Sequence, residues 1–217
     1  MREKSAKSLK RILASNIGVP TKLLDTIDDR SYDRIASKYR ITAFLGSGLN
    51  GVALACEDNT VLKITSDRTE ALASHMLIGA RIPHVLEIYA VEKIKNGLYC
   101  ISCKRYRKSK ISSKVWDSID SFISDIICLD DNCSSIEADE FANRYKKQFS
   151  SLSNYSTYRK HLLNASNVFQ ALLTLKALGI EFIDFDKSNI MCDENGDIVI
   201  IDLGWSKFSV DTLVATL

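Results

Sequence analysis

The stretch of residues 180–204 constrains the fold more than any other part of the chain. Two short apolar runs flank the acidic sequence of residues 193–197. Within that sequence, the Asn195-Gly196 pair readily supplies the positive φ angles that a tight turn between antiparallel strands needs. The stretch therefore predicts a β-hairpin whose strands are residues 189–192 and 198–201.

Two polar residues stand at the same end of this predicted hairpin. Asn189 begins the first strand and Asp202 follows the second, so antiparallel pairing brings their oxygens to one end of the ribbon. Amide and carboxylate oxygens suit a magnesium ion that carries phosphate. Taken alone, an Asp-rich turn between apolar strands is more often an ordinary solvated hairpin, so the rest of the chain must separate the two interpretations.

The second constraint is a glycine pattern, Gly-Ser-Gly-Leu-Asn-Gly, at residues 46–51. In a dinucleotide-binding fold such a pattern leads directly into a helix. Here it joins two predicted strands, and a third predicted strand that follows, residues 60–64, carries Lys63. A lone Lys in an apolar strand is otherwise an edge residue that points to water. The order of loop, strand and Lys strand instead favours a loop whose backbone amides approach nucleotide phosphates.

Residues 180–204 also resemble the catalytic segment of the protein-kinase-like fold, which includes protein kinases and small-molecule phosphotransferases. Asp184 lies five residues before Asn189, and Asp202-Leu203-Gly204 follows thirteen residues after Asn189. These are the spacings of the kinase catalytic loop and of its metal-binding Asp-Phe-Gly. The resemblance covers about residues 41–204.

The catalytic segment departs from most protein kinases at three positions. Phe182 stands in place of a His, Ile183 in place of an Arg, and Asp186 in place of a Lys that contacts phosphate. Lys187 is adjacent to that last position. A loop of this kind, followed by Asn-Ile-Met and Asn-Gly-Asp, is similar to the serine/threonine kinases encoded by some short-tailed bacteriophages.

The resemblance assigns roles to individual residues. Asp184 would orient and deprotonate the acceptor hydroxyl, while Asn189 and Asp202 would hold Mg²⁺. Lys63 would contact the α and β phosphates of ATP, and Ala53 would lie against the adenine. The remaining expected nucleotide-binding residues are Gly46, Ser47, Gly48 and Gly51 in the glycine loop, and Glu70.

Glu70 has two competing interpretations. In the family, a Glu on the helix after the Lys strand pairs with that Lys, and Glu70 is the only Glu between Lys63 and Glu87. The separation of seven residues from Lys63 is shorter than in most protein kinases. Asp67 and Glu70 also form a pattern like a capping box, in which Glu70 would only satisfy the helix N-terminus.

The expected architecture is α+β, a bilobal protein-kinase-like fold. Residues 1–40 would be a basic helical extension, residues 41–106 an N-lobe with a five-stranded antiparallel sheet, and residues 107–217 an abbreviated, mainly helical C-lobe with the catalytic loop and metal-binding hairpin. Thirteen residues follow Gly204, too few for an activation segment and peptide-binding helices.

Composition narrows the classes of function. A net charge of +2 gives no general attraction to nucleic acid or lipid, and no apolar run is long enough to cross a bilayer. Six Cys at irregular spacing fit reduced, buried thiols, and Cys100 and Cys103 would point to opposite faces of one strand. We expect a cytoplasmic protein, in the host cytoplasm if phage-encoded, with no membrane partner and no specific nucleic acid.

The function that these patterns favour is an ATP- and Mg-dependent Ser/Thr protein kinase that acts on protein substrates, host proteins among them if it is phage-encoded. A small-molecule kinase is the first alternative, because the peptide-binding helices have no room. A pseudokinase that serves as a nucleotide-binding interaction module is the second, because of Phe182 and Asp186. A nucleic-acid binder ranks last, since no groove-reading motif accompanies the basic stretch at Lys104.

Overall fold

The computed structural model of the chain describes residues 27, 29–108, 116–117, 167–181, 186–204 and 206–208. These residues belong to two compact units. The first unit comprises the described residues up to Arg81 together with Leu86–Arg105 and Asp202–Lys207, and the second comprises Ile82–Val85, the described residues within Tyr106–Ile201, and Phe208.

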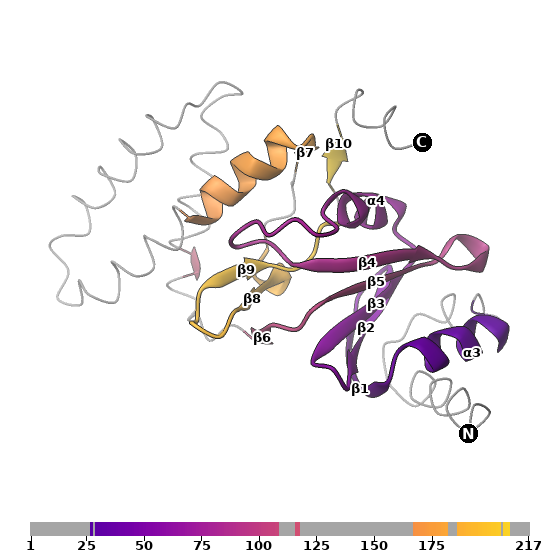
Figure 1. Ribbon diagram of the computed structural model, residues 1–217. Coiled ribbons are helices and arrows are strands. Elements are labelled where there is room, and N and C mark those ends of the chain that lie inside the picture. The colour runs from indigo at the N-terminus through magenta and orange to yellow at the C-terminus, as the bar shows by residue number, and fades with distance from the viewer. Residues whose placement is uncertain are drawn as a thin grey trace, which may run out of the picture. The chain divides into compact units, whose positions relative to one another are not determined.

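The first unit contains a five-stranded antiparallel sheet in the order β1-β2-β3-β5-β4 (Figure 1). This confirms the predicted sheet and its α+β class. Glycine, Asn and Asp residues, which favour turns, lie between the strands, and Asn59, Asn96 and Gly97 have positive φ angles there. The strands are β1 (Ile41–Ser47), β2 (Gly51–Cys56), β3 (Thr60–Thr65), β4 (Ile88–Lys93) and β5 (Tyr99–Lys104), with the 3-10 turn η1 (Lys95–Gly97) between the last two.

One face of the sheet is the apolar core of the first unit. Alternate residues of β2, β3 and β5 point to it, because side chains alternate along a strand. Helix α3 (Asp29–Lys38) covers this face and contributes the buried Ile35. Tyr39 donates a hydrogen bond to Glu92, which also pairs with Lys38, so the end of the helix is tied to β4. The core is Ile27, Ile35, Val52, Leu54, Cys56, Leu62, Ile64, Ile94, Leu98 and Cys100.

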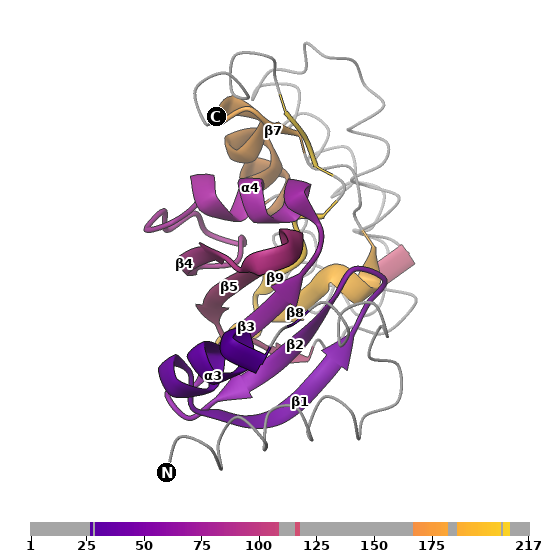
Figure 2. The same cartoon turned by 90° about the vertical axis from the view of Figure 1, so that its right-hand side faces the viewer.

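Helix α4 (Arg68–Met76) lies against the opposite face, as Figures 1 and 2 both show. Asp67 caps its N-terminus and accepts hydrogen bonds from the N–H groups of Thr69 and Glu70. The chain leaves the helix through Gly79, whose φ of 75° favours glycine. The helix expected after the Lys strand is thus present.

The second unit contains the predicted hairpin. Strand β8 (Ile190–Cys192) pairs antiparallel with β9 (Ile198–Ile200), and the outer strand β6 (Arg107–Lys108) pairs with β8. Gly196 has a φ of 82°, whereas Asn195 does not have a positive φ. The turn is therefore wider than a two-residue turn, and the Asp193 carboxylate holds it by accepting from the N–H groups of Asn195 and Asp197.

The second unit also contains a helix over residues 167–177, where the apolar spacing predicts one. Val168, Phe169 and Leu175 are buried on one side, and Gly179, with a φ of 79°, lies just after the helix. The remaining short elements are β7 (Ile180–Glu181), the 3-10 turn η2 (Lys187–Asn189) and β10 (Lys207–Phe208). The apolar spacing of residues 115–126 predicts a further helix and the polar stretch of residues 130–154 predicts an insertion; apart from residues 116–117, both lie outside the described residues.

Within the described part of the chain, no helix is both long enough and apolar enough to span a membrane.

Candidate functional site

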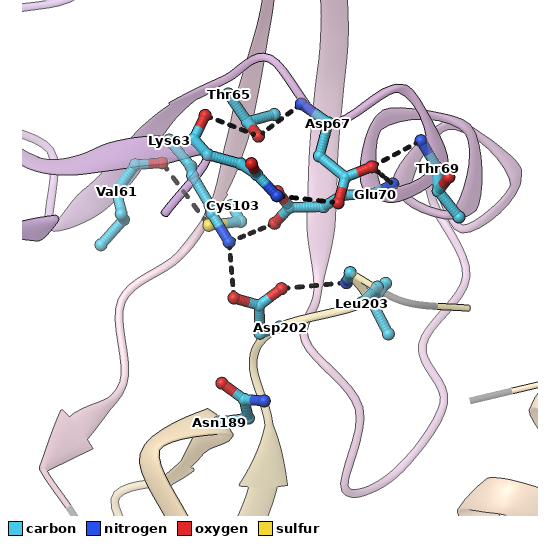
Figure 3. A network of polar contacts seen from close by, with 12 residues as sticks. Val61, Lys63, Thr65, Asp67, Thr69, Glu70, Cys103, Asn189, Asp202 and Leu203 are labelled. Carbon is cyan, nitrogen blue, oxygen red and sulfur yellow. Dashed lines mark hydrogen bonds and ion pairs between the residues drawn. The ribbon is translucent and has the colours of Figure 1, made fainter. Parts of the chain in front are cut away.

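The candidate site is built around the ammonium group of Lys63 on β3 (Figure 3). This group forms an ion pair with the Glu70 carboxylate from α4 and lies 2.9 Å from the Asp202 Oδ2 atom. All three residues belong to the first unit, although Asp202 is 139 residues from Lys63 in sequence. The fold therefore brings a cation and two anions together on the α4 face of the sheet.

Burial and charge act in opposite directions on this cluster. Burial raises the pKa of Glu70 to about 7, and the positive charge of Lys63 only partly offsets that effect. Burial alone would lower the pKa of Lys63, but the carboxylates of Glu70 and Asp202 outweigh it and the pKa is raised. Lys63 is therefore a fixed positive charge at neutral pH, whereas Glu70 titrates near neutrality.

The two interpretations of Glu70 make different predictions for its contacts. In a capping box the Glu70 side chain would accept a hydrogen bond from the Asp67 N–H group. That N–H group instead donates to the Thr65 hydroxyl over 3.0 Å, and the Glu70 carboxylate pairs with Lys63. Asp67 alone serves as the cap of α4, and Glu70 has the contact that the family resemblance implies.

Asp202 is held by both of its carboxylate oxygens. Oδ2 faces Lys63, and Oδ1 accepts a hydrogen bond from the N–H group of Gly204 over 2.9 Å. A Cβ atom at Gly204 would lie 3.1 Å from that Oδ1 atom and 3.4 Å from an oxygen of Asp67, so this close approach favours glycine. Leu203 is buried and Asp202 is partly exposed, so the segment is fixed while the carboxylate remains accessible.

The glycine loop joins β1 and β2 as predicted. The N–H group of Gly48 donates to the carbonyl of Gly51 over 2.9 Å and closes the loop. A Cβ atom at Gly51 would lie only 2.3 Å from the Ile64 carbonyl oxygen, so Gly51 allows β2 to approach the end of β3. By contrast, a Cβ atom at Gly46 or Gly48 would lie in open space.

The register places Ala53 on the same face as Lys63, because the two residues are directly opposite in β2 and β3. Cys103 shares this face, opposite Val61, and its thiol donates to the Val61 carbonyl. Cys100 lies on the other face, in the core under α3. The two thiols therefore cannot bind one metal ion, as their spacing predicts, and burial raises the pKa of each to about 12.

The donors needed for a magnesium ion can be tested on the described residues. In these residues no cluster of three or more His, Cys, Asp or Glu side chains could form a protein-only metal site. Each oxygen of Asp202 makes one contact in the network above, and a carboxylate oxygen can accept two. The Asp202 oxygens are hard donors of the kind that a phosphate-bound Mg²⁺ takes, so this residue fits the ion.

The catalytic-loop residues are described only in part. Asp184, with Phe182 and Ile183, lies outside the described residues. Asp186 caps the short turn η2, because its Oδ1 atom accepts from the N–H and hydroxyl groups of Ser188. These hydrogen bonds lower the pKa of Asp186. The role of Asp184 as base and those of Asn189 and Asp202 as metal ligands remain predictions.

The sequence interpretation missed the contacts of Asn50, Thr65 and Ser66 near the glycine loop. The Asn50 carbonyl accepts from the Ser66 N–H group at 2.8 Å, the Ser66 hydroxyl at 3.1 Å and the Thr65 hydroxyl at 3.4 Å. The Asn50 side chain reaches Asp67. The signal that could have found them is the run Thr-Ser-Asp directly after the Lys strand, since short polar residues at a helix start bind nearby backbone.

The chain was compared with known proteins. No protein-family model matches it, and no curated protein matches it. Among solved structures, 541 chains match. One is the kinase PK-1 of the Cydia pomonella granulovirus, which is 17% identical with a TM-score of 0.46. That match covers 84% of this chain and 61% of the viral kinase, so the chain spans less than two thirds of that protein.

Proposed function

We propose that the protein has a protein-kinase-like fold and is an ATP- and Mg²⁺-dependent phosphotransferase that acts on Ser or Thr hydroxyls of proteins. The observation that carries the proposal is the position of Lys63, which pairs with Glu70 and Asp202 on the same face as Ala53. A phosphate-binding Lys needs such neighbours, because they fix its ammonium group and keep it charged.

Each part of the site then has a separate task. The glycine loop receives the phosphates, Ala53 lies against the adenine, and Lys63 contacts the α and β phosphates. Asp202 and Asn189 would hold Mg²⁺, which would neutralise the charge that develops on the transferred phosphoryl group. Asp184 accepts the proton of the acceptor hydroxyl.

The first test compares the parent with the Lys63→Met variant, using labelled ATP and Mg²⁺ with casein as a generic acceptor. Loss of the ammonium group weakens MgATP binding and abolishes detectable transfer, because no other described cation lies in the cluster. Lys38→Met is the matched control, since Lys38 pairs with Glu92 on β4, outside the Lys63 cluster. Equal MgATP binding by the parent and Lys63→Met would refute the proposal.

The acceptor class requires a second experiment. Incubation of the active protein with a mixed protein lysate and with a panel of hydroxyl-bearing metabolites separates a protein kinase from a small-molecule kinase. We expect label on Ser and Thr of proteins. Label that enters metabolites alone would replace this acceptor assignment and leave the phosphotransferase intact.

A nucleotide-binding module without catalysis is the second candidate. It is favoured by Asp186, which stands where many kinases have a Lys and whose carboxylate holds the η2 turn. In this contact Asp186 offers neither a positive charge that could bind phosphate nor a general base. The observation that would favour this candidate is tight MgATP binding by a parent protein that never transfers phosphate.

A further inference from the structure

The base of the glycine loop is anchored to the start of α4 by residues that the proposed mechanism does not use. The Asn50 carbonyl receives hydrogen bonds from the N–H and hydroxyl groups of Ser66, the residue that follows β3. The Asn50 side-chain amide lies 3.5 Å from Asp67 Oδ2 and donates toward it. The loop therefore contacts the segment between β3 and α4 through both its backbone and its side chain.

Asp67 is the point where three parts of the first unit meet (Figure 3). Its Oδ1 atom caps α4 by accepting from the N–H groups of Thr69 and Glu70. Its Oδ2 atom faces Asn50 of the glycine loop and lies 3.4 Å from the position that a Cβ atom of Gly204 would take. A shift of Asp67 would therefore change contacts with the glycine loop, with the helix that carries Glu70, and with the segment beside Asp202.

Thr65 reinforces this connection from inside the sheet. Its side chain is fully buried, and its hydroxyl accepts from the Asp67 N–H group over 3.0 Å and lies 3.4 Å from the Asn50 carbonyl. A buried hydroxyl with both a donor and an acceptor partner holds a defined position. Because Thr65 is two residues from Lys63 in β3, the same hydrogen bonds fix the end of the Lys strand.

We propose that Asn50 and Asp67 form a latch that positions the glycine loop relative to α4, so that the phosphate-binding backbone and the Lys63–Glu70 pair are held together. Both are positioning residues, since they act through the loop and the helix. The proposal deepens the proposed function and rests on it for its kinetic consequence. The latch itself is a property of the free protein and can be measured without ATP.

Exchange of the two side chains provides the sharpest test. Asn50→Asp places two carboxylates face to face and breaks the latch. The double variant Asn50→Asp/Asp67→Asn restores one amide and one carboxylate, and Asn is as good a helix cap as Asp. Asn59→Asp is the matched control, because it makes the same charge change at an exposed turn of the same sheet. Asn50→Ala is the milder variant should Asn50→Asp fail to fold.

The kinetic readout is the KM for MgATP against kcat, with casein as acceptor. The loop amides contact phosphate in the ground state and the transition state alike, so a broken latch raises KM with kcat little changed. We expect KM to rise about fivefold to tenfold in Asn50→Asp, the scale of one lost hydrogen bond, and to return within about twofold in the double variant. A merely unstable variant would lose active enzyme, and hence apparent kcat, at an unchanged KM.

The second readout is hydrogen exchange at the Ser66 amide of the protein without nucleotide. Protection falls in Asn50→Asp and is restored in the double variant, while Asn59→Asp matches the parent. If Asn50→Asp has the parental KM and protection, or if the double variant is no better than the single, the latch is refuted. If the parent does not bind MgATP, the proposed function fails, and the exchange data alone decide whether the latch exists.

Discussion

Glu70 and Asp202 share the single ammonium group of Lys63, although they come from a helix and from a segment far along the chain. The two carboxylates lie in different environments, since Glu70 is buried and the side chain of Asp202 is 34% exposed. A buried partner keeps the Lys in place, whereas an exposed partner remains available to a ligand. This asymmetry gives the two carboxylates separable roles, which the first predictions use.

Glu70→Gln should remove most phosphotransfer with little loss of stability. Gln keeps the shape of the side chain but cannot neutralise Lys63, so the ammonium group loses its buried partner. Asp67 remains to cap the helix, so α4 keeps its N-terminal hydrogen bonds. Turnover with labelled ATP and the urea midpoint measure the two effects. Glu57→Gln is the control, because its pair with Arg40 is exposed, and equal activity in Glu70→Gln and the parent would contradict the prediction.

The pKa of Glu70 predicts a pH dependence of stability. Because burial raises this pKa from 4.5 to about 7, the folded protein holds a proton that the unfolded chain has already released. This contribution is fully present below pH 4.5 and is lost as the pH rises to about 7, at most about 3 kcal/mol. It is measured as the difference in unfolding free energy between the parent and Glu70→Gln at pH 5 and pH 8. A difference that does not change with pH would contradict it.

Phosphotransfer should respond to pH in the opposite direction. The Lys63–Glu70 pair requires an ionised carboxylate, so kcat/KM for MgATP rises through pH 7 as Glu70 loses its proton. The Glu70→Gln variant, however weak its activity, should lack this step. A parental step that survives in Glu70→Gln would belong to another group.

Asp202 and Asp184 should fail in different ways when replaced. Asp202→Ala weakens Mg²⁺-dependent ATP binding and transfer together, because a metal ligand beside a polyphosphate is lost. Asp184→Asn leaves MgATP affinity nearly intact and lowers turnover by roughly 10²-fold or more, the scale for loss of a positioned base. Asp186→Asn is the control, since Asn can keep the η2 cap. An inactive Asp186→Asn beside an active Asp184→Asn would mean that the assigned register of the catalytic loop is wrong.

Substitution of the loop glycines by Ala should change the unfolding free energy by different amounts. Gly51→Ala forces a methyl group against the Ile64 carbonyl, so we expect a loss of about 1–3 kcal/mol in unfolding free energy. Gly46→Ala and Gly48→Ala add a methyl group in open space and should stay within about 0.5 kcal/mol of the parent. Chemical denaturation of the three variants compares them directly. Equal stability of all three would show that β2 and β3 can separate at this point without cost.

The sheet was predictable because its signals are local. Turn residues such as Asn59 and Gly97 mark the strand ends, and apolar residues fill the strands. The fourth strand shows the limit of local signals, because the apolar run predicts a start at Val85 and the strand begins at Ile88. His84 has a positive φ, its carbonyl accepts from the Ile200 N–H group, and Val85 bridges to Ile200. These distant contacts hold the first residues of the run outside the sheet.

The site was predictable only where a family resemblance supplied the distances. No periodicity in the sequence relates Lys63 to Asp202, and the local sequence pattern left Glu70 undecided between pairing and capping. The contact between Asn50 and Asp67 had neither kind of support, because a polar residue inside a glycine pattern looks like any loop residue. Hydrogen bonds between side chains of separate segments depend on how the backbone folds, so a short stretch of sequence does not predict them.

Because Cys100 and Cys103 point to opposite faces of the sheet, the opening of each face can be measured separately. Both thiols are buried and hold their protons tightly, so a labelling reagent reacts only after a local opening. Reaction at Cys100 reports departure of α3, and reaction at Cys103 reports exposure of the face that carries Lys63. The labelling rates of these two cysteines in one strand therefore report independently on the anchoring of α3 and on the opening of the proposed nucleotide site.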